Sequence, residues 1–252
     1  MICILASNFK NYIKKNDIKI SCPIDNTNGL VDQLKDNIIR TKKVVFVASD
    51  INDSYEKVSS YANIFFESMS MVGITFLEYF ILYGDNMDKA AEYINDSDLV
   101  FLCGGSTYNQ YIFFEIINLR YLLENYSGIV IGQSAGALNM AIDVFNSPEN
   151  KEESEPIYFD GLGLTNINIE PHFEFDDSVF DENEKYQRDF IIKESYKRTI
   201  YGQCDGSHIL INNSNKVMIC GKTYLIKNGN IDLICNDGES ILINNWFLVG
   251  GI

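Results

Sequence analysis

The sequence is short of positive charge and of long apolar runs. It carries 20 lysine and arginine residues against 35 aspartate and glutamate residues, so its formal net charge is −15. A surface this acidic repels polyanions, which argues against non-specific binding to nucleic acid or to an anionic membrane. No uncharged apolar stretch of about 18 residues is present, which excludes a membrane-spanning helix. The apolar residues 1–6 have no basic start and are too few for a signal peptide, so we expect a buried first strand there.

Paired cysteines are also missing. The six cysteines are scattered without any C-x-x-C pair, at positions Cys3, Cys22, Cys103, Cys204, Cys220 and Cys235. Several lie in apolar, strand-like runs, where a free cysteine behaves as a small apolar residue. The sequence therefore predicts a reduced, cytoplasmic protein with neither a disulfide framework nor a zinc site.

Strand-like and helix-like segments alternate along the first 140 residues. Strands are predicted at 1–6, 44–48, 74–82, 99–103 and 128–131, and helices at 27–40, 54–71, 87–94, 106–125 and after Ser134. Continuous β-branched runs such as 44–48 are typical of strands buried on both faces. This alternation predicts an α/β fold with a mostly parallel sheet and helices on both of its faces.

The pattern changes after this alternating part. Residues 145–160 are polar and acidic, which predicts an exposed loop, and residues 181–198 favour one more helix. From residue 200 onward, short strand-like runs are broken by Asn-Gly, Asp-Gly and Gly-Lys turns, which predict antiparallel C-terminal strands. No repeat and no linker is visible. We therefore expect one domain over residues 1–252, large enough for a substantial core.

A serine at a predicted strand–turn–helix junction is the most informative feature. Residues Gly132–Gly136 read Gly-Gln-Ser-Ala-Gly and join the apolar run 128–131 to a helical segment. In such a G-x-S-x-G turn the serine hydroxyl is exposed above the sheet, and the glycines leave room for the backbone crossing. The next helix points its N-terminus at an anion formed beside the serine. This context favours Ser134 as an acyl-transfer nucleophile over a chance match in a loop.

A serine nucleophile needs a base, and the chain has only two histidines. His172 follows a predicted strand that ends at Pro171, and strand ends are the usual place for catalytic residues of α/β sheets. His208 lies in a turn that opens another strand, where a structural, hydrogen-bonded imidazole is favoured. We therefore predict His172 as the base.

Two backbone amides could stabilise the oxyanion. The first is that of Ala135, directly after the serine, and the second lies in the glycine-rich turn Gly104–Thr107, which follows the strand ending at Cys103. An ordinary strand-to-helix turn with Ser106 or Thr107 as the helix N-cap is the alternative, and both roles can coexist.

An acidic residue should orient the imidazole. The acidic candidates considered are Asp143, Glu149, Glu170 and Asp205. With 35 acidic residues in the chain, sequence position does not choose among them.

Three motifs together resemble peptidase family S51, whose best-known member, peptidase E, is an aspartyl dipeptidase. Gly104–Thr107 is similar to the family's Gly-Gly-Asn-Thr turn, and Gly132–Ala137 to its Gly-x-Ser-Ala-Gly-Ala turn. Pro171–Phe173 is similar to its Pro-His-Phe/Tyr motif. In order and spacing the resemblance covers residues 42–212. It implies a class I glutamine amidotransferase-like, flavodoxin-like fold.

The resemblance also implies roles for single residues. Ser134 would be the nucleophile, His172 the base, and Gly105 and Ala135 the oxyanion donors. The family's acidic residue lies where Glu149 stands here, fifteen positions after Ser134.

The chain departs from the family at several positions. Glu149 replaces an aspartate, and Ser106 an asparagine. Family members that bind an N-terminal aspartate carry an Arg-x-x-Arg pair on the helix after the histidine, where this chain has Lys185 and Arg188. Lysine cannot form the bidentate clamp that arginine makes on a carboxylate, and a solvated helix face is the alternative for both. The implied substrate-binding residues are Ser106, Thr107, Lys185 and Arg188.

The leading hypothesis is a serine peptidase of short peptides, namely dipeptides with an N-terminal aspartate, that needs no metal and no organic cofactor. The second is a cyanophycinase-like β-aspartyl peptidase, or another amidase or esterase, on the same machinery. The third is a non-catalytic homologue that binds a ligand. The predicted partner is a small peptide substrate, and neither nucleic acid nor a membrane is expected as a partner. The sequence does not distinguish a monomer from a homodimer.

Overall fold

The computed structural model of the protein describes residues 1–148, 152, 155–175, 182–212, 214 and 216–243. No helix within these ranges combines the length and the apolar character needed to cross a membrane.

A mixed eight-stranded sheet forms the centre of the molecule. Its strands are β1 (Ile2–Ala6), β4 (Lys43–Val47), β5 (Glu78–Leu82), β6 (Leu99–Leu102), β7 (Ile129–Gln133), β12 (His208–Ile211), β13 (Val217–Cys220) and β16 (Ser240–Ile243). They lie in the order β16-β13-β12-β1-β7-β6-β4-β5. The pairs from β1 to β5 are parallel, whereas β12, β13 and β16 are antiparallel. The prediction of a mostly parallel central sheet in an α/β fold is confirmed.

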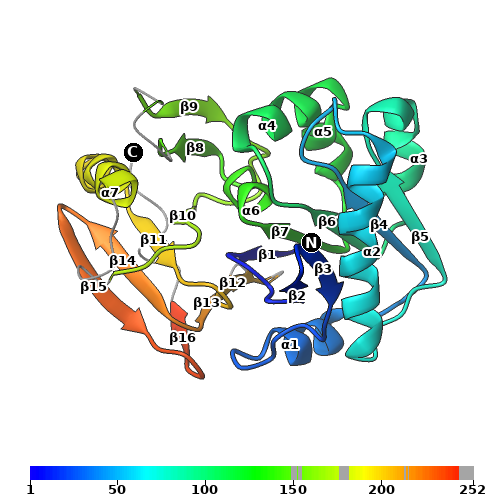
Figure 1. Ribbon diagram of the computed structural model, residues 1–252, viewed down its shortest axis with the longest axis horizontal. Coiled ribbons are helices and arrows are strands. Elements are labelled where there is room, and N and C mark those ends of the chain that lie inside the picture. Colours follow the sequence, from blue (N-terminus) through cyan, green and yellow to red (C-terminus); the bar gives the residue numbers. More distant parts are fainter. Residues whose placement is uncertain (149–151, 153–154, 176–181, 213, 215, 244–252) are drawn as a thin grey trace.

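Helices lie on both faces of this sheet. They are α1 (Leu30–Asn37), α2 (Tyr55–Met71), the 3₁₀ helix η1 (Gly84–Lys89), α3 (Ala90–Ile94), α4 (Thr107–Ile116), α5 (Leu119–Leu123) and α6 (Ala135–Leu138), whereas α7 (Glu182–Glu194) packs against a second sheet. Figure 1 shows α4 and α5 above the sheet and α1 below it. The helix predicted over 106–125 is two helices, because Asn118 takes the left-handed conformation (φ 53°) between them.

The acidic segment predicted as an exposed loop is structured at both of its ends. Strands β8 (Asp143–Asn146) and β9 (Ile157–Asp160) pair antiparallel there. Val144 and Phe145 are almost fully buried, which explains the difference: two apolar side chains anchor a strand whose remaining residues are polar. The loop prediction is therefore wrong for these two stretches.

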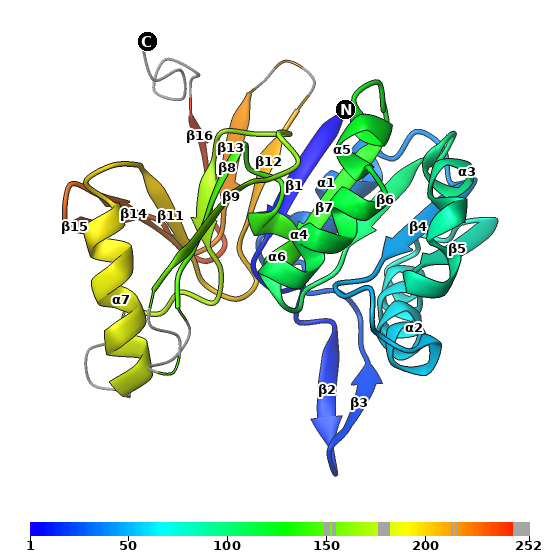
Figure 2. The ribbon, with the colours of Figure 1, turned by 90° about the horizontal axis from the view of Figure 1, so that it is seen from above.

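A second, smaller sheet stands beside the central one. Its strands are β10 (Asn168–Glu170), β11 (Ile200–Gln203), β14 (Thr223–Lys227) and β15 (Asn230–Cys235), in the order β10-β11-β14-β15. Helix α7 lies beside this sheet (Figure 2) and shares a small apolar cluster with it, which includes Ile191 and Ile226. The antiparallel C-terminal strands that the turns predicted are divided between the two sheets.

A short hairpin projects from the central sheet (Figure 2). Its strands are β2 (Tyr12–Lys15) and β3 (Ile18–Ser21). Asn16 and Asp17 form its two-residue turn, both with φ above zero, as the tight turns that suit hairpins require. Sequence reasoning assigned no element to this stretch.

Candidate active site

Ser134 occupies a strained bend between β7 and α6. Its backbone angles, φ 51° and ψ −115°, fall outside the regions that a residue with a side chain normally adopts. Such strain costs on the order of 1–3 kcal/mol and persists only where the surroundings enforce it. Here the Ser134 amide donates to the carbonyl oxygen of Ala6 at 2.9 Å, which ties the bend to the end of β1.

The two glycines of the motif are required by close backbone packing. A Cβ atom on Gly132 would meet the backbone of Gly136 and Ala137, and one on Gly136 would meet the carbonyl of Leu102 on β6. Any larger residue would push α6 away from the sheet. The bend that exposes the serine therefore depends on both glycines, as the motif predicts.

The structure brings His172 against Ser134. His172 Nε2 lies 3.0 Å from Ser134 Oγ, although 38 positions separate the residues. His172 follows β10 and has φ 56°, and its backbone amide donates to Ser7 Oγ at 2.8 Å. Ser7 directly follows β1, so the imidazole is held at the edge where β1 and β10 end.

Asp205 lies on the other side of the imidazole. Its Oδ1 is 2.6 Å from His172 Nδ1, and it also accepts from Ser7 Oγ at 3.1 Å. Burial raises the pKa of this carboxyl, but the hydrogen bond and charge of His172 outweigh it, and the pKa lies below its ordinary value. An ionised carboxylate only accepts hydrogen bonds, so the ring proton must be on Nδ1. In the neutral form of the imidazole, Nε2 then carries no proton and can accept the proton of Ser134.

None of the other acidic candidates that the structure describes contacts the imidazole. Glu149, the residue implied by family position, lies outside the described residues. Glu170 accepts from Ser147 and Gln187, and Asp143 pairs with Arg198 at 3.1 Å. Asp205, which sequence reasoning left among several candidates, is the carboxylate at the imidazole.

One signal in the sequence could have pointed to Asp205. It follows the strand-like run at 200–203, just as His172 follows the run at 167–170. The two runs form β10 and β11, which pair in parallel, so both residues lie beyond the carboxyl ends of neighbouring strands.

The amides of Gly105 and Ala135 are free to donate. Neither forms a hydrogen bond within the part of the chain that the structure describes. A Cβ atom on Gly104 would lie 3.4 Å from Ser134 Cβ, so the glycine turn packs directly against the serine. Gly105 has φ 153°, and a Cβ atom there would collide with Ser49. Two available amides next to one hydroxyl fit the geometry of an oxyanion hole.

Among the four residues implied for substrate binding, only Arg188 lines a cavity that also includes His172. Ser106 caps α4 by accepting from the Asn109 amide at 3.4 Å, and Thr107 is buried. Lys185 is an exposed residue of α7. Arg188 lines a small cavity of about 50 Å³ together with His172, and its guanidinium lies 5.5 Å from the Phe175 ring centroid.

A larger cavity of about 300 Å³ opens directly at Ser134. Gly104, Gly105, Ser134 and His172 line it on the side of the strand ends, and the N-terminal hairpin and α2 supply much of the remainder. Cys103 also faces this cavity, but burial raises the pKa of its thiol to about 12, so it remains protonated and is a poor nucleophile.

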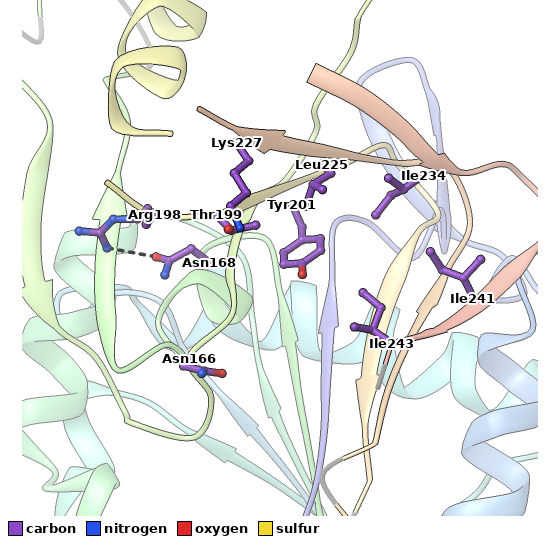
Figure 3. Close-up of a pocket in the computed structure, with 10 residues that line it drawn as sticks. All are labelled: Asn166, Asn168, Arg198, Thr199, Tyr201, Leu225, Lys227, Ile234, Ile241 and Ile243. Atoms are coloured by element: carbon purple, nitrogen blue, oxygen red, sulfur yellow. Dashed lines mark hydrogen bonds between the residues drawn. The ribbon is translucent and has the colours of Figure 1, made fainter. Parts of the chain in front are cut away.

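A cavity larger than this one lies elsewhere in the described chain. It measures about 560 Å³, and residues such as Asn168, Tyr201 and Ile243 line it between the second sheet and β16 (Figure 3). Neither Ser134 nor His172 takes part in it. The larger cavity is therefore not the candidate active site. The smaller cavity is, because Ser134 and His172 line it.

His208 is not part of the site. It is completely buried on β12, and its Nε2 lies 2.9 Å from Gln33 Oε1. Burial lowers its pKa to about 4, so the imidazole is neutral at physiological pH. This agrees with the structural role predicted for it.

A serine in such a bend, with an imidazole at its hydroxyl, defines the class of α/β serine hydrolases. Comparison with known proteins narrows the class. The sequence model of peptidase family S51 matches residues 24–219. The chain therefore belongs to peptidase family S51 and is a serine-type peptidase.

Two solved structures share the fold. A peptidase from an acI-B1 Actinobacterium is 14% identical with a TM-score of 0.69, and the alignment covers 96% of each chain. A candidate peptidase E protein from Listeria monocytogenes EGD-e is 16% identical with a TM-score of 0.54, covering 86% of this chain and 96% of that one. No curated protein matches the chain significantly.

Proposed function

We propose that this serine peptidase hydrolyses short peptides through a triad of Ser134, His172 and Asp205. The observation that carries the proposal is the continuous chain of contacts, 3.0 Å from Ser134 Oγ to His172 Nε2 and 2.6 Å from Nδ1 to Asp205. The cavity of about 300 Å³ at Ser134 suits a dipeptide better than a folded protein.

In the proposed reaction, His172 Nε2 takes the hydroxyl proton as Ser134 Oγ attacks the scissile carbonyl carbon. Asp205 holds the ring with its proton on Nδ1 and stabilises the imidazolium that forms. His172 then gives the proton to the leaving amine. A water molecule, deprotonated by the same imidazole, hydrolyses the acyl-enzyme and restores Ser134.

The oxyanion of each tetrahedral intermediate would be bound by the amides of Gly105 and Ala135. Both donors are preorganised in tight turns, so they need no reorganisation as the charge develops. All groups required for these steps are side chains and amides of this chain, so the proposal involves no metal and no organic cofactor.

The finer assignment is a dipeptidase for substrates with an N-terminal aspartate. Family membership and the position of Arg188 beside His172 support it.

We further propose that the protein is cytoplasmic and that it is a monomer or a homodimer. We also propose that it is a single domain with a class I glutamine amidotransferase-like, flavodoxin-like fold. The nucleophile at the carboxyl edge of a parallel sheet is the feature that supports this fold assignment.

The test is turnover of Asp-X, β-Asp-X and Leu-X dipeptides by the wild type and by Ser134→Ala. Cleavage of Asp-X that the substitution abolishes supports the proposal. Preferential cleavage of β-Asp-X would instead favour a cyanophycinase-like peptidase. Turnover retained by Ser134→Ala would refute the mechanism. A wild type that neither cleaves nor binds any of these peptides would favour a non-catalytic homologue.

A further inference from the structure

The N-terminal hairpin brings a lysine to the cavity at Ser134. Tyr12 of β2 and Lys19 of β3 line this cavity together with Ser134 and His172. Lys19 is the one lysine or arginine among the described residues that line it. Its side chain therefore supplies positive charge inside a cavity of a chain whose net charge is −15.

Two aromatic rings hold the Lys19 ammonium. Its Nζ lies 4.4 Å from the ring centroid of Tyr12 and 4.5 Å from that of Tyr61, which is on α2. The faces of aromatic rings attract a cation without neutralising it. Among the described residues, no carboxylate lies within 4.0 Å of this ammonium, and no hydrogen bond from it is formed. The group is therefore positioned by the two rings, and no carboxylate of the described ranges forms an ion pair with it.

The hairpin is fastened to α2, so Lys19 has a defined position. Ser21 Oγ donates to Glu67 on α2 at 2.6 Å. Ser68, also on α2, donates to the carbonyl oxygen of Asn11 at 2.9 Å. Figure 1 shows β3 beside α2. These bonds anchor both ends of the hairpin next to the cavity.

We propose that Lys19 binds a carboxylate of the peptide substrate and so determines specificity. This inference rests on the proposed peptidase function and adds a residue outside helix α7. A lysine ammonium binds a carboxylate through charge-assisted hydrogen bonds. An acidic dipeptide offers two such groups, the side chain of its N-terminal residue and its C-terminal carboxylate. Lys14, directly opposite Lys19 in the hairpin register, adds charge of the same sign.

The test compares Lys19→Met with Lys15→Met on three peptides, Asp-Leu, Asn-Leu and Asp-Leu amide. Lys15 lies on the opposite face of the same hairpin and is exposed, so it controls for loss of a lysine in this element. Lys19→Met should lower kcat/KM for Asp-Leu by about tenfold to a hundredfold, as expected for loss of a hydrogen bond to a charged group. Lys15→Met should leave it unchanged, and Lys19→Arg should restore most of it.

The two neutral analogues identify which carboxylate is bound. If the side chain is the partner, Lys19→Met changes turnover of Asp-Leu amide but not of Asn-Leu. If the C-terminus is the partner, the reverse holds. Equal loss on all three peptides, or loss on none, would overturn the proposal.

Binding to the Ser134→Ala protein separates this inference from the proposed function. Calorimetric titration with the same peptides needs no turnover, so it reports on Lys19 even if hydrolysis fails. If Lys19 binds a substrate carboxylate, adding Lys19→Met should raise the Kd for Asp-Leu by about tenfold or more. Unchanged affinity would refute it, whatever the wild type hydrolyses.

Discussion

At the scale of single residues, Ser134 and His172 could be paired from the sequence, but their acidic partner could not. Ser134 lies in a local motif, and His172 is one of only two histidines. The acid is one of 35, and its place is decided by the parallel pairing of β10 with β11, which no local pattern encodes. Family position pointed to Glu149 and the geometry to Asp205.

Asp205→Asn is therefore expected to lower kcat by about 10³- to 10⁴-fold, because the amide would hold the imidazole in the wrong tautomer. Steady-state kinetics on a cleaved dipeptide provide the measurement. Asp232→Asn, an exposed residue of β15, is the matched control. Glu149→Gln should leave kcat nearly unchanged. A large loss in Glu149→Gln with a small one in Asp205→Asn would reverse the assignment.

At the scale of elements, the buried strands were predicted best. Continuous apolar runs such as 44–48 and 99–103 became β4 and β6 within one residue at each end. Boundaries failed where a single residue or a tertiary contact decides them, as at Asn118 between α4 and α5. The hairpin of β2 and β3 was not predicted, because its strands are short and exposed. Only its Asn16-Asp17 turn is a sequence signal for a hairpin.

The glycine turn after β6 allows a test at this scale. Gly105→Ala adds a Cβ atom that collides with Ser49, so the turn must shift and its amide leaves the oxyanion position. We expect kcat to fall by about 10²- to 10³-fold, the usual effect of losing one oxyanion donor.

Gly73→Ala provides the control for this substitution. Gly73 also has positive φ (81°), but a Cβ atom there meets no atom within 4 Å. It should cost about 1 kcal/mol of stability through backbone strain and leave kcat unchanged. If both variants keep full kcat, the turn does not bind the oxyanion.

At the scale of the whole molecule, the site is assembled between two sheets. Ser134 and the glycine turn belong to the central sheet, whereas His172 and Asp205 extend from strands of the second sheet. Ser7, at the end of β1, contacts both residues of the second sheet. Integrity of the central sheet is therefore a condition for the site, and His208 makes that integrity depend on pH.

His208 is buried in the central sheet with a folded pKa of about 4, below its ordinary value of 6.5. Between these values the unfolded chain binds more protons than the folded one. The stability that the neutral His208 imidazole contributes is therefore fully present above pH 6.5 and is lost as pH falls toward 4. The loss amounts to about 3 kcal/mol in the free energy of unfolding.

Urea unfolding across this pH window measures the effect. His208→Gln should be less stable at neutral pH and should lose less stability on acidification than the wild type. Equal slopes for the wild type and His208→Gln would contradict this account.

The central claim is that Ser134 is activated by His172 and Asp205. The most direct measurement is the rate of covalent labelling by a fluorophosphonate, followed by intact mass and mapping of the modified peptide, because it requires an activated serine and no knowledge of the substrate. The account predicts one adduct per chain on Ser134, with much slower labelling in His172→Ala and Asp205→Asn. An adduct on another residue, or equal labelling rates in all three proteins, would contradict it.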